Sequence, residues 1–286
     1  MTVGDALKWG VACLDKQVGA SVDSRREARD LLCRALGRDH AWLIAHDRDE
    51  LPDESLNRYG DLMFRRTQKE PLAYVLGDAW FLGRVFKVTP ATLIPRPATE
   101  HIVEAALTAA EQIGAEDIID VGTGSGVVAV SLALGRPESR VWATDVSADA
   151  LSVARENADR ARVERIGFLQ GNLLEPLPDE IWRDPTVLVA NLPYIPENDW
   201  GDLAEEIRKF EPRSALVSGA DGLDHYRELI DQLLKREKSN VALCVEILPK
   251  QEPELTELLR RAWPKSEVET VRNLAGDAIG LTCLIR

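Results

Sequence analysis

The chain has 286 residues, enough for one large domain or for a medium domain with a small companion. Its 45% hydrophobic and 29% charged residues are typical of a soluble globular protein, and a formal net charge of −13 counts against a nucleic-acid-binding protein, which usually carries a basic surface. No run approaches the roughly 18 apolar residues of a membrane helix. The N-terminal segment lacks the layout of a secretory signal, so we expect a cytoplasmic protein without membrane contact.

Neither the basic residues nor the cysteines indicate a binding or catalytic site. The basic pairs Arg25-Arg26 and Arg65-Arg66 are flanked by acidic or polar residues and are typical of solvated helix faces. The four cysteines are far apart, with no CxxC pair and no nearby histidine cluster: Cys13, Cys33, Cys244 and Cys283. We therefore expect reduced thiols, no disulfide and no metal site.

Residues 1–71 are predicted to form a helical domain. Apolar residues recur at helical spacing over 28–36, and Gly37 follows as a C-terminal stop. A short apolar stretch begins at Trp42, and a further helix precedes Pro71. Residues 72–94 differ, because they are rich in β-branched and aromatic residues and contain two glycines. They are predicted to form a β-hairpin or extended linker.

Residues 95–286 show strand–helix alternation. Pro97 is suited to the first turn of a helix. Short apolar runs predict buried strands at 117–121, 141–145, 166–169, 187–190 and 241–247, with helical patterns between most of them. Such alternation is typical of an α/β domain with a mostly parallel sheet and helices on both faces. Near the end, 267–271 and 281–285 flank the turn-like segment 273–280, which predicts an antiparallel hairpin.

A glycine-rich loop follows the first of these strands and leads into a helix that begins near Val127. Glycines let the backbone approach a ligand closely, and a helix N-terminus offers free N–H groups. The third glycine of a dinucleotide fingerprint would fall at Val127, and no lysine follows as in a phosphate-binding loop. The loop therefore favours a cofactor without a pyrophosphate. Its residues are Gly122, Thr123, Gly124, Ser125 and Gly126.

Polar residues lie at or just after the ends of the strands next to this loop. Asp145 ends the second strand, where a carboxylate can accept hydrogen bonds from both ribose hydroxyls. We expect Asp120 to face an amino group of the cofactor, and Asn172, with the adjacent Leu173, to lie where an adenine amino group can be read. A glycine loop alone could be a tight turn, but its combination with Asp145 favours a binding site. The combination resembles the class I methyltransferase fold, which implies S-adenosylmethionine as the cofactor.

The tetrapeptide Asn191-Leu192-Pro193-Tyr194 follows the fourth strand, at the same sheet edge as the glycine loop. It resembles the (Asn/Asp)-Pro-Pro-Tyr motif of methyltransferases that alkylate planar, conjugated nitrogens. The Asn191 side-chain oxygen and the next backbone carbonyl can accept both N–H bonds of such a nitrogen, and Tyr194 offers a flat face. We expect Asn191 to contact the cofactor as well. Leu192 replaces a proline, which keeps the carbonyl but adds an N–H and frees the backbone angle.

The tetrapeptide alone does not identify the substrate, because it also resembles the motif of ribosomal RNA adenine dimethyltransferases. No general base is evident in the sequence. His101 and His225 are present, but lone histidines without partners are more often structural or solvated.

Longer blocks outside the site carry a more specific resemblance. They are Glu70–Gly77, Leu93–Pro97 with Thr99-Glu100, Glu211–Arg213 with Ala215-Leu216, and Asp221–Leu223 with Tyr226-Arg227. By these blocks the chain is identified as a member of the release-factor glutamine methyltransferases, the HemK/PrmC family, over roughly residues 25–250. It departs from the family pattern at Leu248, where glycine is usual, and at Ile279, where a basic residue is usual.

The resemblance implies methyl transfer from S-adenosylmethionine to the side-chain amide nitrogen (N5) of the glutamine in the Gly-Gly-Gln motif of class I peptide chain release factors. It also implies that the helical domain grips that partner, and that Arg96 and Glu100 shape the rim of the substrate site. We expect a monomer that takes no nucleic acid as a direct substrate.

Three alternatives remain open at this level. An N6-adenine methyltransferase acting on RNA or DNA would need a basic groove beside Tyr194, which the charge balance does not favour. A methyltransferase-like binding module without activity is weakened by the presence of Asp145, Asn191 and Tyr194. NAD-dependent oxidoreduction is disfavoured by the glycine spacing.

Overall fold

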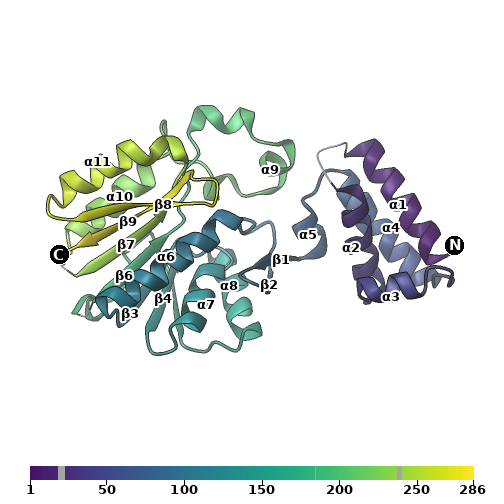
Figure 1. Cartoon of the computed structure of the whole chain (residues 1–286), viewed down its shortest axis with the longest axis horizontal. Coiled ribbons are helices and arrows are strands. Elements are labelled where there is room, and N and C mark those ends of the chain that lie inside the picture. The colour runs from purple at the N-terminus through teal and green to yellow at the C-terminus, as the bar shows by residue number, and fades with distance from the viewer. Residues whose placement is uncertain (19–22, 184, 237–239) are drawn as a thin grey trace. The chain divides into compact units, whose positions relative to one another are not determined.

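The computed structural model describes residues 1–18, 23–183, 185–236 and 240–286. The described residues divide into two compact units. The first comprises Met1–Asp78 with Ala204–Phe210, and the second comprises Ala79–Leu203 with Glu211–Arg286 (Figure 1). Each unit has its own hydrophobic core.

The first unit is helical, as predicted. Its helices over the N-terminal part are α1 (Val3–Gln17), α2 (Ser24–Leu36), α3 (His40–Ala45), α4 (Asp53–Thr67) and α5 (Leu72–Leu76). The side chains of Thr2, Asp23 and Asp39 accept hydrogen bonds from the first turns of α1, α2 and α3. Gly37 ends α2 in the left-handed conformation, as expected. Residues 72–76 are helical rather than extended, so the hairpin begins later than the segment predicted for it.

A segment from the second half of the sequence also packs into the first unit. This is α9 (Glu205–Phe210), which contacts the others through a buried arginine. Arg66 is 2% exposed, and its guanidinium pairs with Glu27 of α2 at 2.7 Å and with Glu206 of α9 at 3.2 Å. A buried charge requires such partners, so these pairs fix α9 against α2 and α4.

The predicted hairpin is confirmed, with strands β1 (Asp78–Phe81) and β2 (Arg84–Lys87). Leu82 and Gly83 form its turn, and both have positive φ angles. The Leu82 N–H donates to Glu100 Oε1 at 2.8 Å, which ties the turn to the helix that follows the hairpin.

In the described chain the second unit is built on a seven-stranded sheet, in the order β5-β4-β3-β6-β7-β9-β8. The neighbours from β5 to β7 run parallel. The final pair forms the antiparallel hairpin that the sequence predicts. The strands are β3 (Asp117–Val121), β4 (Arg140–Asp145), β5 (Ile166–Gln170), β6 (Thr186–Ala190), β7 (Val241–Glu246), β8 (Glu267–Arg272) and β9 (Ala278–Ile285).

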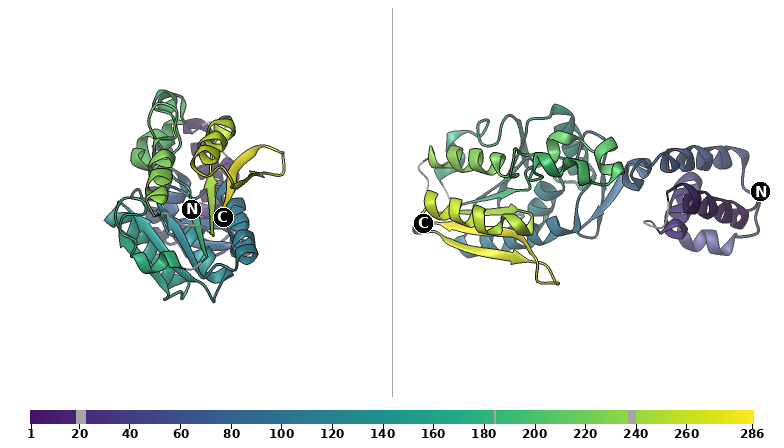
Figure 2. Two further views of the ribbon diagram at one scale, coloured as in Figure 1. Left: turned by 90° about the vertical axis from the view of Figure 1, so that its left-hand side faces the viewer. Right: turned by 90° about the horizontal axis from the view of Figure 1, so that it is seen from above.

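Helices cover both faces of this sheet (Figures 1 and 2). Alternate residues of one strand face opposite cores, as Ile118 and Ile119 of β3 do. One core packs against α6 (Pro97–Ile113), α7 (Val127–Gly135) and α8 (Ala148–Arg160). The other packs against α10 (Asp224–Leu234) and α11 (Glu252–Ala262). The α/β architecture is therefore confirmed.

The strand order determines where a ligand can bind. The chain passes from β3 to β4 and β5 on one side, then returns to place β6 on the other side of β3. Such a reversal opens a crevice at the carboxyl ends of the strands. Among the described residues, no helix combines the length and the apolar character needed to span a membrane.

Candidate active site

A cavity of about 320 Å³ lies at this edge, a size typical of small-molecule sites. Of the residues predicted for the site, it is lined by Asp120, Gly122, Thr123, Gly124, Ser125, Asp145, Asn172, Leu173, Asn191, Leu192 and Pro193. Among the described residues, four other predicted positions lie outside the lining: Gly126, Tyr194, Arg96 and Glu100. The structure therefore gathers the glycine loop, the acids and most of the tetrapeptide around one cavity.

The last glycine of the loop lies outside the cavity lining and allows close packing behind it. Gly126 precedes α7 with φ +79°, a conformation that side chains disfavour. A Cβ atom there would lie 2.8 Å from Ala154 Cβ and 2.9 Å from Ala154 Cα. Its absence lets α8 pack closely against the loop, which holds Gly124 and Ser125 at the cavity.

Asp145 sits at the end of β4 with both carboxylate oxygens partly engaged. Oδ2 accepts from the Gly124 N–H at 2.9 Å, and Oδ1 accepts from the Ser147 N–H at 2.8 Å. Burial raises the pKa of this carboxyl, while the backbone hydrogen bonds act in the opposite direction. Each oxygen keeps a lone pair, so the pair can accept hydrogen bonds from a vicinal diol in the cavity. These contacts also shape the glycine loop.

Asp120, at the end of β3, is 2% exposed. Its Oδ2 accepts from Thr123 Oγ1 at 2.6 Å and from the Ala129 N–H at 3.0 Å. Burial, with a smaller contribution from the nearby Asp145 carboxylate, raises the pKa of Asp120 to about 7, although the two hydrogen bonds act in the opposite direction. The two carboxyl groups together favour a positively charged ligand.

This pKa predicts a pH-dependent affinity for a cationic cofactor. A cation favours ionised Asp120, so if the cofactor is S-adenosylmethionine, as the sequence predicts, its dissociation constant should fall as pH rises from 6 to 8 and then level off. Because Asp120 is half protonated near pH 7, binding there should release about half a proton per site. Calorimetry in buffers of different ionisation enthalpy measures this release. Asp120→Asn should abolish it, and an unchanged release would assign the proton to another group.

Asn172 is oriented by α10. Its Nδ2 donates to Glu228 Oε1, which leaves the side-chain oxygen as the acceptor available to a ligand. The adjacent Leu173 is buried with φ +51° and also lines the cavity. This orientation suits an adenine amino group, which donates hydrogen bonds.

Asn191 follows β6 and is held by neighbours from other elements. Its Nδ2 donates to Thr99 Oγ1 at 3.0 Å, and Thr99 in turn donates to Glu246 Oε2 at 2.6 Å. Tyr194 OH donates to Glu246 Oε1 at 3.1 Å. Burial and the adjacent Glu246 both raise the pKa of Tyr194, so its hydroxyl stays neutral. Glu246 thus binds the Tyr194 hydroxyl directly and is linked to the Asn191 amide through Thr99.

Leu192 packs inward although proline is usual at this position. It is 3% exposed, and a Cβ atom added at Gly122 would lie 3.0 Å from Leu192 Cδ2, so the glycine allows this close packing. Leucine keeps the backbone carbonyl of this position and fills buried space beside the glycine loop, but it lacks the fixed backbone angle of proline.

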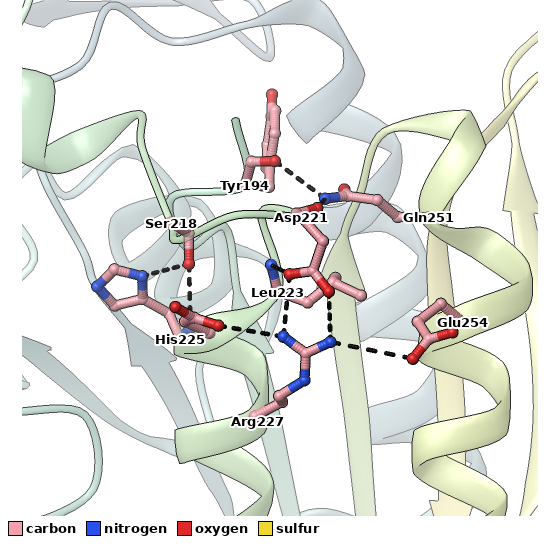
Figure 3. A network of polar contacts seen from close by, with 9 residues as sticks. Tyr194, Ser218, Asp221, Leu223, His225, Arg227, Gln251 and Glu254 are labelled. Atoms are coloured by element: carbon pink, nitrogen blue, oxygen red, sulfur yellow. Dashed lines mark hydrogen bonds and ion pairs between the residues drawn. The ribbon is translucent and has the colours of Figure 1, made fainter. Parts of the chain in front are cut away.

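The backbone of Tyr194 is fixed by a separate network (Figure 3). Gln251 Nε2 donates to the carbonyl oxygens of Tyr194 and Asp221, both at 3.0 Å. Gln251 Oε1 accepts from the Leu248 N–H at 3.0 Å. Asp221 is paired with Arg227, whose hydrogen bond lowers the Asp221 pKa to about 2. On the other side of this loop, Ser218 contacts His225 Nδ1 at 2.6 Å, so His225 has a partner.

Gly222→Ala should disrupt this network. Gly222 has φ +82°, and an added Cβ would lie 2.1 Å from the Tyr194 carbonyl oxygen. We expect a loss of about 2–4 kcal/mol in the free energy of unfolding, from backbone strain and the clash. We also expect kcat to fall on the order of a hundredfold, because the tetrapeptide must shift. Chemical denaturation and steady-state kinetics measure the two effects.

Gly276→Ala is the matched control for Gly222→Ala. Gly276 has φ +88° but no atom within 4 Å of the added Cβ. The Gly276→Ala variant should lose about 1–2 kcal/mol in the free energy of unfolding through backbone strain alone, and its kcat should not change. Equal kinetic losses in both variants would contradict a specific role for the Tyr194 contact.

Arg96 and Glu100 hold the chain that leads into the cavity. Arg96 pairs with Glu211 Oε1 at 2.5 Å, and the other oxygen of Glu211 accepts from the Ile94 N–H at 3.1 Å. Glu100 accepts from the hairpin turn at Leu82. These are the contacts of a salt-bridged loop and a helix end. Their expected role at the rim of the substrate site stays a prediction.

Three residues of the networks around the tetrapeptide were missed as site residues by the sequence analysis: Thr99, Glu246 and Gln251. Glu246 had a usable signal, since it is an acid that closes a fully buried strand at the same sheet edge as Asn191. Thr99 had the signal of its family block, although that block does not indicate its partners, and Gln251 had none because its partners are distant in the sequence. All four cysteines are free, and the described residues contain no cluster that could hold a metal ion.

The sheet order, the glycine loop after β3 and the acid after β4 define a class I methyltransferase. A methyltransferase-domain model matches residues 114–211, and a model of the PrmC N-terminal domain matches residues 5–77. The chain belongs to the release factor glutamine methyltransferase family. A Bordetella pertussis protein of that name is 41% identical over 252 residues, covering 88% of this chain and 92% of the relative. A Bacillus subtilis protein of the same name is 33% identical over 288 residues, covering 99% and 98%.

Solved structures share the fold. The structure titled hMettl16 catalytic domain in complex with MAT2A 3′UTR hairpin 1 is similar with a TM-score of 0.56, at 15% identity. The match covers 79% of this chain and 81% of that one. At this identity the likeness establishes the architecture alone.

Proposed function

We propose that this protein transfers a methyl group from S-adenosylmethionine to the side-chain amide nitrogen (N5) of the glutamine in the Gly-Gly-Gln motif of class I peptide chain release factors. The observation that carries the proposal is the orientation of Asn191. Its amide nitrogen is bound to Thr99, which leaves Oδ1 to accept an N–H from a ligand in the cavity. The names of the relatives support the choice of substrate.

The residues around the cavity suit S-adenosylmethionine. Asp145 has lone pairs for ribose hydroxyls, Asn172 has an acceptor for an adenine amino group, and the buried Asp120 favours a cation. When bound, this cofactor supplies a methyl group already activated on a sulfonium. The glycine loop at the end of β3 lets the backbone lie against it.

The protein's own contribution is to orient a weak nucleophile. The lone pair of an amide nitrogen is delocalised, so the nitrogen must be aimed at the methyl group. Asn191 Oδ1 and the Leu192 carbonyl would accept its two N–H bonds, and the Tyr194 ring would lie against the amide plane. Orientation of this kind can supply roughly 7–11 kcal/mol of the barrier reduction.

We propose that residues 1–71 form the domain that grips the release factor, that 72–94 link the domains, and that 95–286 carry out the transfer. The match of a PrmC N-terminal domain model to residues 5–77 supports a distinct helical domain. A release factor acts on ribosomes, so this substrate implies a cytoplasmic enzyme. The relatives' names do not favour adenine in nucleic acid as the substrate.

The test is label transfer from radiolabelled S-adenosylmethionine. The purified protein is mixed with a class I release factor, with a Gly-Gly-Ala variant of that factor, or with ribosomal RNA. We expect label on the unaltered factor and none on the variant, with the modified glutamine located by peptide mass spectrometry. Label on RNA alone would replace the proposed substrate, and label on neither would indicate a binding module.

A further inference from the structure

A buried carboxylate lies beside the tetrapeptide, and the proposed chemistry does not use it. Glu246 ends β7 and is 2% exposed. In the parallel pairing of β6 with β7, Ala190 lies opposite Val245, so Asn191 and Glu246 are the next residues along the two strands. Removing a carboxylate from water costs several kcal/mol, so a buried one requires hydrogen-bond donors.

The donors of Glu246 are two hydroxyl groups, one on each oxygen. Thr99 Oγ1 lies 2.6 Å from Oε2, and Tyr194 OH lies 3.1 Å from Oε1. A hydroxyl has one proton to donate. When Thr99 donates it to Glu246, its oxygen can only accept from Asn191, which lies 3.0 Å away. Asn191 must then present Nδ2 to Thr99 and Oδ1 to the cavity.

We propose that Glu246 is a positioning residue that sets the orientation of the Asn191 amide through the hydroxyl of Thr99. This inference rests on the proposed function. An ionised carboxylate only accepts, so it forces one direction on the chain Asn191–Thr99–Glu246. Burial raises the pKa of Glu246, while the hydrogen bonds from Thr99 and Tyr194 and the charge of Arg96 keep it lower. A carboxamide in place of Glu246 can face Thr99 with its oxygen or with its NH2 group, and in the second case Thr99 can turn and donate to Asn191 Oδ1. The amide would then present an N–H to the substrate N–H, and the two donors would repel.

This chain of hydrogen bonds connects residues that are far apart in the sequence. Thr99 lies in the first turn of α6, Asn191 directly follows β6, and Glu246 ends β7. The Tyr226 hydroxyl donates to the Glu246 backbone carbonyl, which fixes the end of β7 against α10. The carboxylate is thereby held where it can receive both hydroxyl groups.

Glu246→Gln tests the proposal with a side chain of equal size. We expect kcat for release-factor methylation to fall at least tenfold, on the order of a hundredfold, with little change in KM. Affinity for S-adenosylmethionine, measured by calorimetry, should stay within about twofold, because Glu246 does not line the cavity among the described residues. Glu111→Gln, an exposed change on α6, is the matched control and should match the unaltered protein in every measurement.

Thr99 variants separate orientation from a merely structural role. Thr99→Val keeps the shape and removes the hydroxyl, so its kcat should fall as far as that of Glu246→Gln. Thr99→Ser restores the hydroxyl and should recover most of the activity. In the double variant Glu246→Gln/Thr99→Val the losses should not add, because both changes break one chain of hydrogen bonds.

A direct readout is the side-chain amide of Asn191 in asparagine labelled with nitrogen-15. Exchange of its two amide protons with water should be slow in the unaltered protein and in Thr99→Ser. Exchange should be at least tenfold faster in Glu246→Gln and Thr99→Val. This measurement needs no substrate, so its outcome does not depend on whether the release factor is the substrate. Unchanged exchange and unchanged kcat in both Glu246→Gln and Thr99→Val would overturn the proposal. If Glu246→Gln fails to fold, Thr99→Val and Thr99→Ser decide the question by the same two measurements.

Discussion

Replacing Asn191 by alanine is expected to lower kcat for methylation of the release factor by about a thousandfold. The change removes the oxygen proposed to hold the substrate N–H, while the Leu192 carbonyl and the Tyr194 ring remain. A delocalised nitrogen lone pair gains little from one remaining contact, because small misplacements at the reacting atom cost large factors in rate. Single-turnover kinetics with excess enzyme measures this step without interference from product release.

Asn191→Asp is the matched comparison for Asn191→Ala. The aspartate keeps an acceptor toward the cavity but has no N–H for Thr99. The kcat of Asn191→Asp should therefore lie between those of the alanine variant and the unaltered protein. Calorimetry should show similar cofactor affinity for both variants, which separates the transfer step from cofactor binding. A loss below tenfold for Asn191→Ala would show that the asparagine does not orient the nucleophile.

Replacing Asp145 by alanine is expected to raise the dissociation constant of S-adenosylmethionine by about a hundredfold or more. Two effects combine in this loss. The proposed hydrogen bonds from the ribose hydroxyls disappear, and the N–H groups of Gly124 and Ser147 lose the carboxylate that orders them. Isothermal titration calorimetry measures the affinity directly.

Two variants calibrate the Asp145 result. Asp145→Asn keeps one acceptor oxygen but turns an amide N–H toward a backbone donor, so its affinity should be intermediate. Asp159→Asn removes an exposed carboxylate from α8 and should bind the cofactor normally. If Asp145→Ala kept the affinity of Asp159→Asn, the end of β4 would not be the ribose site.

Much of the second unit followed from local patterns. The run Asp117–Val121 was predicted as a strand, and the structure has it between the same residues. It could be recognised because a strand buried on both faces reads as a continuous apolar run. Gly37 and Pro97 marked helix ends for an equally local reason, since their backbone angles are restricted or unusual.

Local patterns failed where contacts outweigh residue preferences. Residues 72–76 contain β-branched and aromatic side chains, yet they form α5 with Tyr74 and Val75 buried. The segment 204–210 lies between parts of the second unit in the sequence, yet it packs with the first through Arg66 and Glu206. Neither outcome is visible in the periodicity of the segment itself, because each depends on partners supplied by other elements.

The sequence by itself determined the parts of the site that follow strands in an alternating pattern, namely the glycine loop, Asp145 and the tetrapeptide. The carboxyl ends of parallel strands meet at one edge, so residues that close successive strands are brought together by topology alone. Only the tertiary structure decided how Asn191 is oriented. Thr99 and Glu246 are 147 residues apart, and hydrogen-bond direction depends on which donor and acceptor atoms meet in space, which no local pattern records.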